Sequence, residues 1–207
     1  TRATFVAALL STAFVSPARG QAAAASDPAI GVYRFGGGRE VYVEYLPDID
    51  GLVMMEFPSG RVRPLRTTAP GQFTFGPSIG AAEPVEATLE VNGERLRWTE
   101  RGRVSTARRA RFNSEEVTLH NGAVTLSGTL TLPRGRGPFP AVVLLHGGGA
   151  QTRDFFWVTH FFTRRGVAVL AYDKRGVGRS GGDWRTARTI DLAEDGLTAV
   201  DYLYARG

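Results

Sequence analysis

Residues 141–154 read AVVLLHGGGAQTRD, and this stretch decides the fold that the sequence predicts. Its first five residues, Ala141 to Leu145, form an unbroken apolar run, which is typical of a strand covered on both faces and therefore of a parallel, layered sheet. The tetrapeptide His146-Gly147-Gly148-Gly149 follows directly at the carboxyl end of that strand, where open α/β sheets place their ligands. Glycines at such a place let backbone N–H groups approach a substrate, which acyl transfer requires for stabilising an oxyanion.

The residues after this turn predict a strand, helix, strand crossover. Asp154 can cap a helix that Gly166 ends, and residues 167–172 form a second buried strand. A further amphipathic helix is expected to begin near Asp191, with Glu194 at capping-box spacing. That helix should cross over to another parallel strand, which the 207 residues do not contain.

The residues before the turn have the alternating pattern of antiparallel strands. Residues 117–132 predict a hairpin about Asn121-Gly122. Residues 30–111 predict a small antiparallel meander, open or barrel-like, in which Asn92-Gly93 is a strong hairpin signal. No motif there indicates a function. Its aromatic residues are expected to fill a core rather than to bind a ligand; they are Tyr33, Phe35, Tyr42, Tyr45, Phe57, Phe73, Phe75 and Trp98.

Two motifs in order carry a family resemblance. HGGGAQTRD at 146–154, followed by YDKRGVGRS at 172–180, resembles the first half of an α/β-hydrolase domain, nearest to the bacterial esterase and serine-peptidase-like group and similar also to dienelactone hydrolases. The resemblance covers about residues 115–207. In that family the residue after His-Gly supplies the first oxyanion N–H, which implies Gly148 here, with Gly149 as the neighbouring candidate. Many relatives carry Ser at the Gly148 position, a difference that leaves a backbone donor intact.

The resemblance implies an α/β fold class, with an incomplete α/β-hydrolase sheet in which an antiparallel hairpin precedes parallel strands joined by crossover helices. The implied domains are a small antiparallel β accessory domain at 27–112 and the N-terminal part of the hydrolase domain at 113–207. The serine, the histidine base and the acid are then expected beyond residue 207, so these residues alone should be inactive.

The activity that follows is that of a serine hydrolase. We expect the complete protein to cleave a small ester, thioester or peptide-like substrate through an acyl-enzyme, without a cofactor. The alternative is a non-catalytic binding protein on the same fold, because fold does not fix function. A later strand ending in Gly-x-Ser-x-Gly favours the enzyme. The identity of the substrate and the oligomeric state stay open.

Two further motif matches in one loop are rejected. Residues 178–182 satisfy G-x-S-x-G, but Asp173-Lys174-Arg175 separates Ser180 from the strand, and loop residues rather than a helix follow it. Residues 176–181 satisfy the dinucleotide fingerprint G-x-G-x-x-G, but no acidic residue ends a following strand. A nucleotide-binding oxidoreductase is therefore not favoured. Asp173 and Arg175 are expected to hold the loop by hydrogen bonds and an ion pair.

The composition of the chain restricts the kinds of partner and bound ion that we expect. The net charge is +5, from 25 basic and 20 acidic residues. The densest basic stretch is interleaved with apolar and acidic residues, as in a solvated strand face, so nucleic acid is not an expected partner; its arginines are Arg95, Arg97, Arg101, Arg103, Arg108, Arg109 and Arg111. The chain has no cysteine, and its three histidines are isolated in sequence, so no metal site is expected. His146 is interpreted as a loop anchor rather than the catalytic base, and His120 and His160 as ordinary residues.

The N-terminal 25 residues have the layout of a signal peptide. Arg2 precedes an apolar run over 3–15, which is too short to span a bilayer, and small residues follow at 22–25. The alternative is a buried helix, which Pro17 and Gly20 would end. We therefore expect a secreted or periplasmic protein without a stable membrane span.

Overall fold

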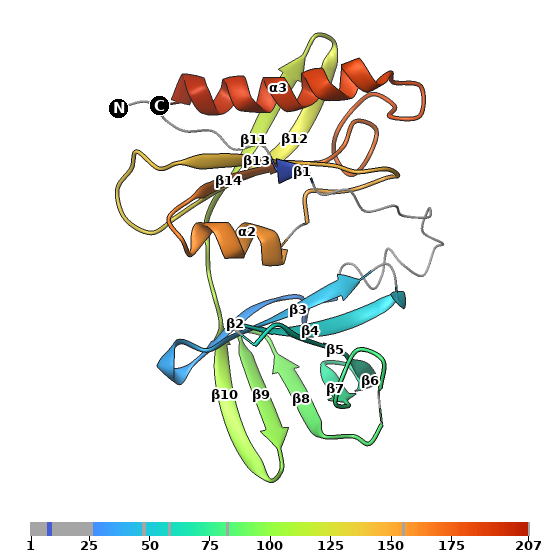
Figure 1. Cartoon of the computed structure of the whole chain (residues 1–207), viewed down its shortest axis with the longest axis vertical. Helices are drawn as coiled ribbons and strands as arrows, with labels where there is room; N and C mark the ends of the chain where they lie inside the picture. The colour runs from blue at the N-terminus through green and yellow to red at the C-terminus, as the bar shows by residue number, and fades with distance from the viewer. Residues whose placement is uncertain are drawn as a thin grey trace. The chain divides into compact units, whose positions relative to one another are not determined.

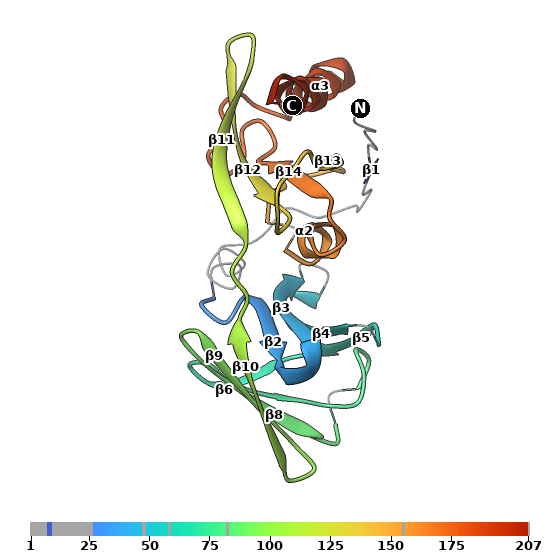
Figure 2. The ribbon, with the colours of Figure 1, turned by 90° about the vertical axis from the view of Figure 1, so that its left-hand side faces the viewer.

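The computed structural model describes residues 8–9, 27–46, 49–57, 59–81, 83–154 and 156–206. These residues divide into two compact units, which meet in the sequence between Arg111 and Phe112 (Figures 1 and 2). The signal peptide expected at 1–25 lies outside the described residues, apart from the two-residue strand β1 (Ala8–Leu9).

The unit before Phe112 is a nine-stranded antiparallel sheet with the order β5-β4-β3-β2-β10-β9-β8-β7-β6 (Figure 1). A short 3-10 turn, η1 (Gly36–Gly38), joins its first two strands. The strands are β2 (Gly31–Phe35), β3 (Glu40–Leu46), β4 (Gly51–Phe57), β5 (Arg61–Pro64), β6 (Arg66–Ala69), β7 (Gln72–Phe75), β8 (Ala87–Asn92), β9 (Arg95–Glu100) and β10 (Arg103–Arg109).

The two edges of this sheet meet, because the edge strands β5 and β6 are consecutive in sequence with only Leu65 between them. The Leu65 N–H donates to the carbonyl of Leu52 in β4, at 2.8 Å. The sheet therefore curls into a nearly closed form, which protects strand edges that would otherwise be exposed. The hairpin expected about Asn92-Gly93 is present, but its two loop residues are Gly93 and Glu94, since Asn92 pairs with Arg95.

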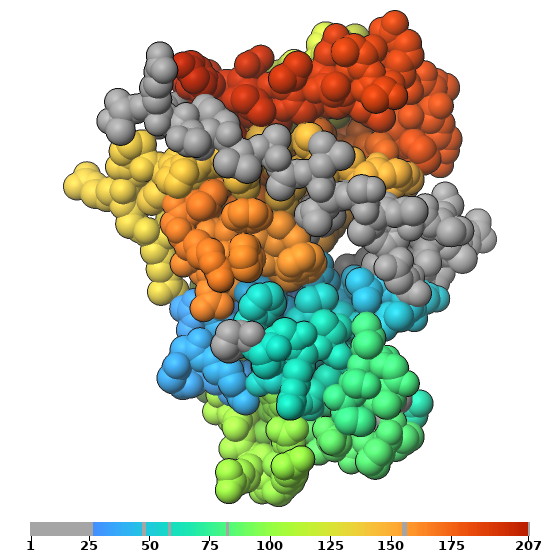
Figure 3. All heavy atoms as spheres, viewed as in Figure 1, coloured from blue at the N-terminus to red at the C-terminus, as the bar shows by residue number. Residues whose placement is uncertain are grey.

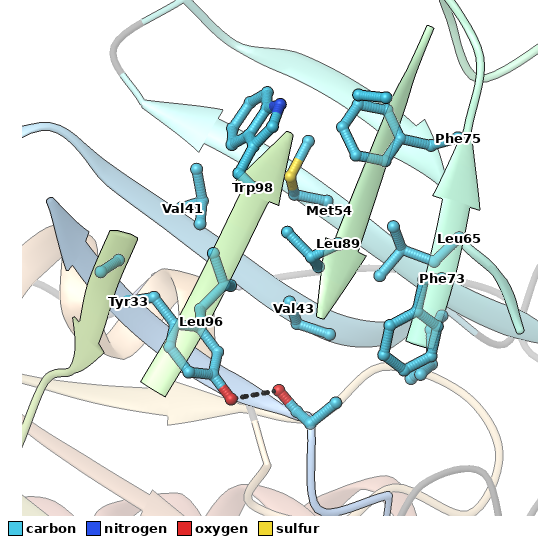
Figure 4. Close-up of a cluster of buried hydrophobic side chains, with 14 of the residues drawn as sticks. Tyr33, Val41, Val43, Met54, Leu65, Phe73, Phe75, Leu89, Leu96 and Trp98 are labelled. Atoms are coloured by element: carbon cyan, nitrogen blue, oxygen red, sulfur yellow. Dashed lines mark hydrogen bonds between the residues drawn. The ribbon is translucent and has the colours of Figure 1, made fainter. Parts of the chain in front are cut away.

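The concave side of this sheet holds one core (Figure 4). In β9, Leu96 and Trp98 are buried while the arginines that alternate with them are exposed, which is the period-2 pattern of a strand with one buried face. Most of the aromatic residues expected in the core are there; Tyr33, Phe35, Phe73, Phe75 and Trp98 belong to the cluster. Tyr33 also donates its hydroxyl to the carbonyl of Ala29, at 2.8 Å.

The second unit contains a five-stranded sheet with the order β1-β13-β14-β12-β11. Its strands are β11 (Asn113–Asn121), β12 (Val124–Leu132), β13 (Ala141–Leu145) and β14 (Ala168–Tyr172), besides β1. β11 and β12 form an antiparallel hairpin, β12 is antiparallel to β14, and β13 and β14 are parallel. Helix α2 (Phe156–Thr163) connects β13 to β14, and α3 (Thr189–Arg206) follows β14.

The two helices lie on opposite faces of this sheet, as Figure 2 shows in side view. Val143 and Leu170 pack toward α3 in one cluster, whereas their neighbours Val142 and Val169 pack toward α2 in another. The unbroken apolar runs of β13 and β14 are thereby covered on both sides. The outer side of α3, red in Figure 3, lies on the surface of its unit.

The expected fold class, an α/β chain built on an α/β-hydrolase sheet with crossover helices, is wrong. The described part of the chain is mostly β, with 46% strand and 17% helix, and its larger sheet is antiparallel with nine strands. The resemblance that implies this class covers about residues 115–207, and the apolar runs at 141–145 and 167–172 account for only two of the fourteen described strands. Alternating segments elsewhere in the chain, including the nine-residue strands β11 and β12, set its class instead.

The start of α3 also differs from expectation. The helix begins at Thr189 rather than near Asp191. The Asp191 carboxylate accepts the backbone N–H of Arg188 at 2.7 Å, so Asp191 lies inside the first turn and caps the helix by reaching back. A carboxylate is also stabilised there by the positive end of the helix dipole.

Candidate active site

The glycine turn 146–149 lies at the carboxyl end of β13, as expected. Gly148 is exposed, and a Cβ built on it would have no heavy atom within 4 Å, so open space lies beside this residue. Gly149 has a φ of +78°, a conformation that glycine adopts without steric cost. The turn thus brings the two predicted oxyanion residues together on consecutive peptides beside open space.

Hydrogen bonds from residues of the same unit hold the glycine turn 146–149 in place. The Gly147 N–H donates to Oε1 of the buried Gln151, at 2.7 Å. Lys174 Nζ donates to the carbonyl oxygens of Gly147 and Gly149, at 2.9 and 3.0 Å. The backbone N–H of Lys174 donates to the Gln151 carbonyl at 3.1 Å. The turn is therefore tied to the segment after β14 by two hydrogen bonds, and Gln151 just after the turn by a third.

Lys174 is a site residue that the sequence interpretation missed. Its side chain is buried, its ammonium lies 4.7 Å from the centre of the Trp184 ring, and burial lowers its pKa. The sequence pattern indicates no role for Lys174 beyond separating the strand from Ser180. One signal could have identified it, because it is the sole lysine in a chain whose other 24 basic residues are arginines.

His146 packs against the strand below the turn. Its ring meets the Tyr172 ring edge-on, with 4.8 Å between centroids, and it has a hydrogen bond with the Tyr172 backbone. Burial lowers the pKa of His146 from 6.5 to about 4, against the opposing effect of that hydrogen bond. The imidazole is therefore neutral at pH 7 and acts in the structure as a contact between β13 and β14.

Asp173 holds the loop that carries the second motif. Its side chain is buried, and its two oxygens accept the backbone N–H groups of Arg153 and Arg179, each at 3.0 Å. Gly178 packs directly on it, because a Cβ there would stand 2.6 Å from Asp173 Oδ2. The carboxylate thus joins the segment after the glycine turn to the loop 176–180.

Arg175 ties the same loop to α3. Its guanidinium forms a two-point ion pair with Asp195, at 2.8 and 2.7 Å, and donates to the Asp191 carbonyl at 3.0 Å. Asn121, at the hairpin of β11 and β12, donates to the same Asp195 carboxylate at 2.8 Å. Asp173 and Arg175 therefore have the loop-holding contacts that the sequence predicted.

The Ser180 hydroxyl is engaged on both sides. It donates to the Asp173 carbonyl at 2.6 Å and accepts the Ser127 N–H at 2.9 Å, and its side chain is buried. α3 begins nine residues later, at Thr189. This environment offers neither the exposed hydroxyl nor the strand-to-helix turn of a nucleophile elbow.

A second match to G-x-S-x-G lies at residues 76–80, in the unit of the nine-stranded sheet. Its Ser78 is in an exposed turn, where it forms a β-bridge with Ala81.

The glycines of the dinucleotide-like match have a structural reason. Gly176 and Gly178 have φ values of +73° and +56°. A Cβ on Gly176 would lie 2.7 Å from the Gly182 carbonyl oxygen. Close packing within the loop accounts for both residues, and neither one opens a helix, as phosphate binding would require.

The described residues contain no group of three or more His, Cys, Asp or Glu side chains that could hold a metal ion. His120 lies on the exposed hairpin, with Nδ1 3.5 Å from Thr125 Oγ1, and His160 packs in α2 against Phe112. Within the same described part of the chain, no helix is both long and apolar enough to cross a membrane.

Comparison with known proteins bears on this same region. Residues 137–207 match the model of a family described as serine aminopeptidase, S33. The chain is 34% identical over 103 residues to esterase EstD of Thermotoga maritima, and the aligned stretch covers 46% of this chain and 24% of that protein. It is 35% identical over 78 residues to esterase FrsA of Escherichia coli, and the aligned stretch covers 37% of this chain and 18% of that protein.

These matches confirm, for part of the chain, the resemblance to an α/β-hydrolase, esterase-like group. The likeness is one of sequence and includes both motifs, 146–154 and 172–180. The chain spans about a quarter or less of the length of these curated relatives.

Proposed function

We propose, from the likeness of residues 137–207 to an esterase-like hydrolase group, that the full-length protein cleaves an ester, thioester or peptide-like acyl bond of a small substrate. The observation that carries the proposal is Gly148, an exposed glycine with open space beside it at the carboxyl end of a buried strand. Because Gly148 has no side chain and open space at its Cβ position, a substrate could come close to the backbone of this residue.

The proposed chemistry is acyl transfer through an acyl-enzyme. A serine attacks the carbonyl carbon and gives its proton to the histidine base, the carbonyl oxygen becomes an oxyanion, and the Gly148 N–H donates to that oxygen. The bond to the leaving alcohol, thiol or amine then breaks as the histidine returns the proton to it, and water hydrolyses the acyl-enzyme in the same way. A donor of this kind contributes on the order of 10²- to 10³-fold to turnover. Gly149 is the neighbouring candidate on the same turn.

The attacking serine is proposed to come from a part of the full-length protein outside these residues, together with its histidine base and its acid. Ser180 is unsuitable because its hydroxyl is buried and bonded to Asp173 and Ser127. His146 is unsuitable as the base because it packs beneath the turn against Tyr172. Export of the protein, from the pattern of residues 1–25, belongs to the same proposal.

A fluorophosphonate probe, which forms a covalent bond with activated serines, tests the proposal. We expect the full-length protein to be labelled and to hydrolyse p-nitrophenyl acetate, and the 207-residue chain to be neither labelled nor active. An unlabelled, inactive full-length protein would favour the alternative, a binding protein without catalysis. Labelling of the 207-residue chain at Ser180 would contradict the assignment of the serine.

A further inference from the structure

The two hydrogen bonds of Lys174 determine which way the peptides of the glycine turn face. In a trans peptide the C=O and the N–H of the same plane point in opposite directions. The bonds 147–148 and 149–150 are not among the cis peptides of the chain. Because the carbonyls of Gly147 and Gly149 point at Lys174 Nζ, the N–H groups of Gly148 and Ala150 point away from it.

We infer that Lys174 is a positioning residue, whose ammonium holds these two peptides so that the Gly148 N–H points away from it, on an exposed residue that has open space at its Cβ position. The inference rests on the proposed function for its catalytic consequence, but not for its geometry. It also adds the Ala150 N–H, rather than that of Gly149, as the second donor with a fixed direction. The N–H of Gly149 belongs to the peptide 148–149, whose carbonyl is not bonded to Lys174 in the described contacts.

The residue type suits this task. An ammonium has three donors and no acceptor, so one Lys174 side chain can bond two carbonyls that converge on it. Glycine peptides flip at little steric cost, so the sequence 147–149 does not fix its own orientation. The Trp184 ring on the ammonium and the bond from Lys174 N–H to the Gln151 carbonyl keep the lysine in place.

The substitution Lys174→Met tests the inference, since it keeps a side chain of similar length and removes the donors. Arg185→Met is the matched control, because Arg185 also stacks on Trp184, with 5.1 Å to the ring centre, but does not bond the turn. Glycine labelled with ¹³C′ and ¹⁵N selects the Gly-Gly peptides of the 207-residue chain by NMR; they lie at 36–38, 147–149 and 181–182.

We expect Lys174→Met to shift the signals of the Gly147–Gly148 peptide and to leave those at 36–38 in place, whereas Arg185→Met shifts neither. In the full-length protein, Lys174→Met should lower kcat for p-nitrophenyl acetate on the order of 10²-fold with KM nearly unchanged, because the donor acts on the transition state. Arg185→Met should retain activity.

An unmoved Gly147–Gly148 signal, or an unchanged kcat in a folded Lys174→Met variant, would overturn the inference. If the wild-type full-length protein is neither labelled by the fluorophosphonate probe nor active on p-nitrophenyl acetate, the proposed function fails, and the glycine signals alone then decide whether Lys174 orients the turn. The two failures are therefore distinguishable.

If Lys174→Met does not fold, Lys174→Cys provides the second test, because the chain has no other cysteine. Alkylation with 2-bromoethylamine in denaturant restores an ammonium at nearly the same reach, and alkylation with iodoethane does not. After refolding, the aminoethyl form should regain the wild-type glycine signals. Equal signals for the two alkylated forms would overturn the inference.

Discussion

Gly93 and Gly102, in hairpin turns of the nine-stranded sheet, and the glycines of the loop after β14 serve different purposes, although Gly71 in the nine-stranded sheet is also crowded, by the Val91 carbonyl oxygen. In the nine-stranded sheet, the turn residues Gly93 and Gly102 have positive φ values, and a Cβ added to either would meet no heavy atom within 4 Å, so glycine there serves only the backbone conformation. In the loop after β14, Gly176 and Gly178 have positive φ values and are also crowded at 2.7 and 2.6 Å. Crowded glycines and buried polar groups occur together in the loop that holds the candidate oxyanion turn.

Buried polar contacts differ between the units in the same way. The core of the nine-stranded sheet is aromatic and aliphatic. The described residues of this unit also include the buried charged side chains of Arg63, which pairs with Glu100 at 3.3 Å, Glu40, which pairs with Arg34 at 2.6 Å, and Glu44. The loop after β14 instead buries Asp173, Lys174 and Ser180 in adjoining hydrogen bonds. The first unit is thus held chiefly by apolar packing, and the turn by a polar network, which fixes directions better than it adds stability.

The largest expected effect comes from breaking that network at Asp173. Asp173→Ala should lower the free energy of unfolding of its unit by about 4 kcal/mol, because it removes a buried carboxylate and leaves the partly buried N–H groups of Arg153 and Arg179 without their acceptor. Asp183→Ala is the control, since Asp183 also accepts a backbone N–H, from Arg185 at 2.9 Å, but is exposed. Urea unfolding measures the free energy of unfolding of both variants. Equal losses of stability for Asp173→Ala and Asp183→Ala would show that burial of the network does not matter.

The contrast between glycines predicts the next effect. Gly178→Ala should cost about 3 kcal/mol, the sum of a left-handed alanine and of the contact with Asp173. Gly102→Ala, which meets open space, should cost about 1 kcal/mol from its backbone conformation alone. Thermal or urea unfolding of the two variants checks the difference. A Gly102 variant as unstable as the Gly178 variant would remove the distinction between open and crowded glycines.

His146 makes the stability of its unit depend on pH. Its pKa is lowered to about 4 in the folded chain and is 6.5 in the unfolded chain, so between these values the unfolded state binds more protons. Stability therefore falls as pH drops from 6.5 to 4, by about 2 kcal/mol once partial access of water is allowed for. Unfolding at a series of pH values, compared with His146→Phe, isolates this contribution; an identical pH profile in the variant would contradict it.

Sequence patterns predicted individual elements of this chain better than its class. The antiparallel meander expected at 30–111 is present, and β9 in it alternates exposed arginines with the buried Leu96 and Trp98 because one buried face gives a period of two. The glycines at 147–149 mark the turn after β13. The fold class failed because a resemblance that covers about residues 115–207 was extended to a chain in which most strands are antiparallel. Pairing order depends on contacts between residues far apart in sequence, which local patterns do not contain.

The candidate site shows the same limit. Gly148 could be named from its motif, but the role of Lys174 depends on a contact across 27 and 25 positions, to Gly147 and Gly149. Nothing in the local pattern of Asp173-Lys174-Arg175 shows which of these charged side chains turns inward. All three do, each toward a different partner: backbone N–H groups, turn carbonyls and the Asp195 carboxylate.

The smallest expected effect comes from the exposed arginines of the nine-stranded sheet. Arg97 pairs with Glu90 at 3.3 Å, and both side chains are about half exposed. Arg97→Ala should change the free energy of unfolding by about 0.5 kcal/mol or less, because water and salt screen such a pair. Arg63→Ala, in the same sheet, should cost several times more, since it removes a buried side chain packed on Phe75 and leaves Glu100 without its partner. Urea unfolding of both variants measures the ratio of the two losses in free energy of unfolding. A large loss for Arg97→Ala would mean that the exposed, arginine-rich face of the strand stabilises the sheet.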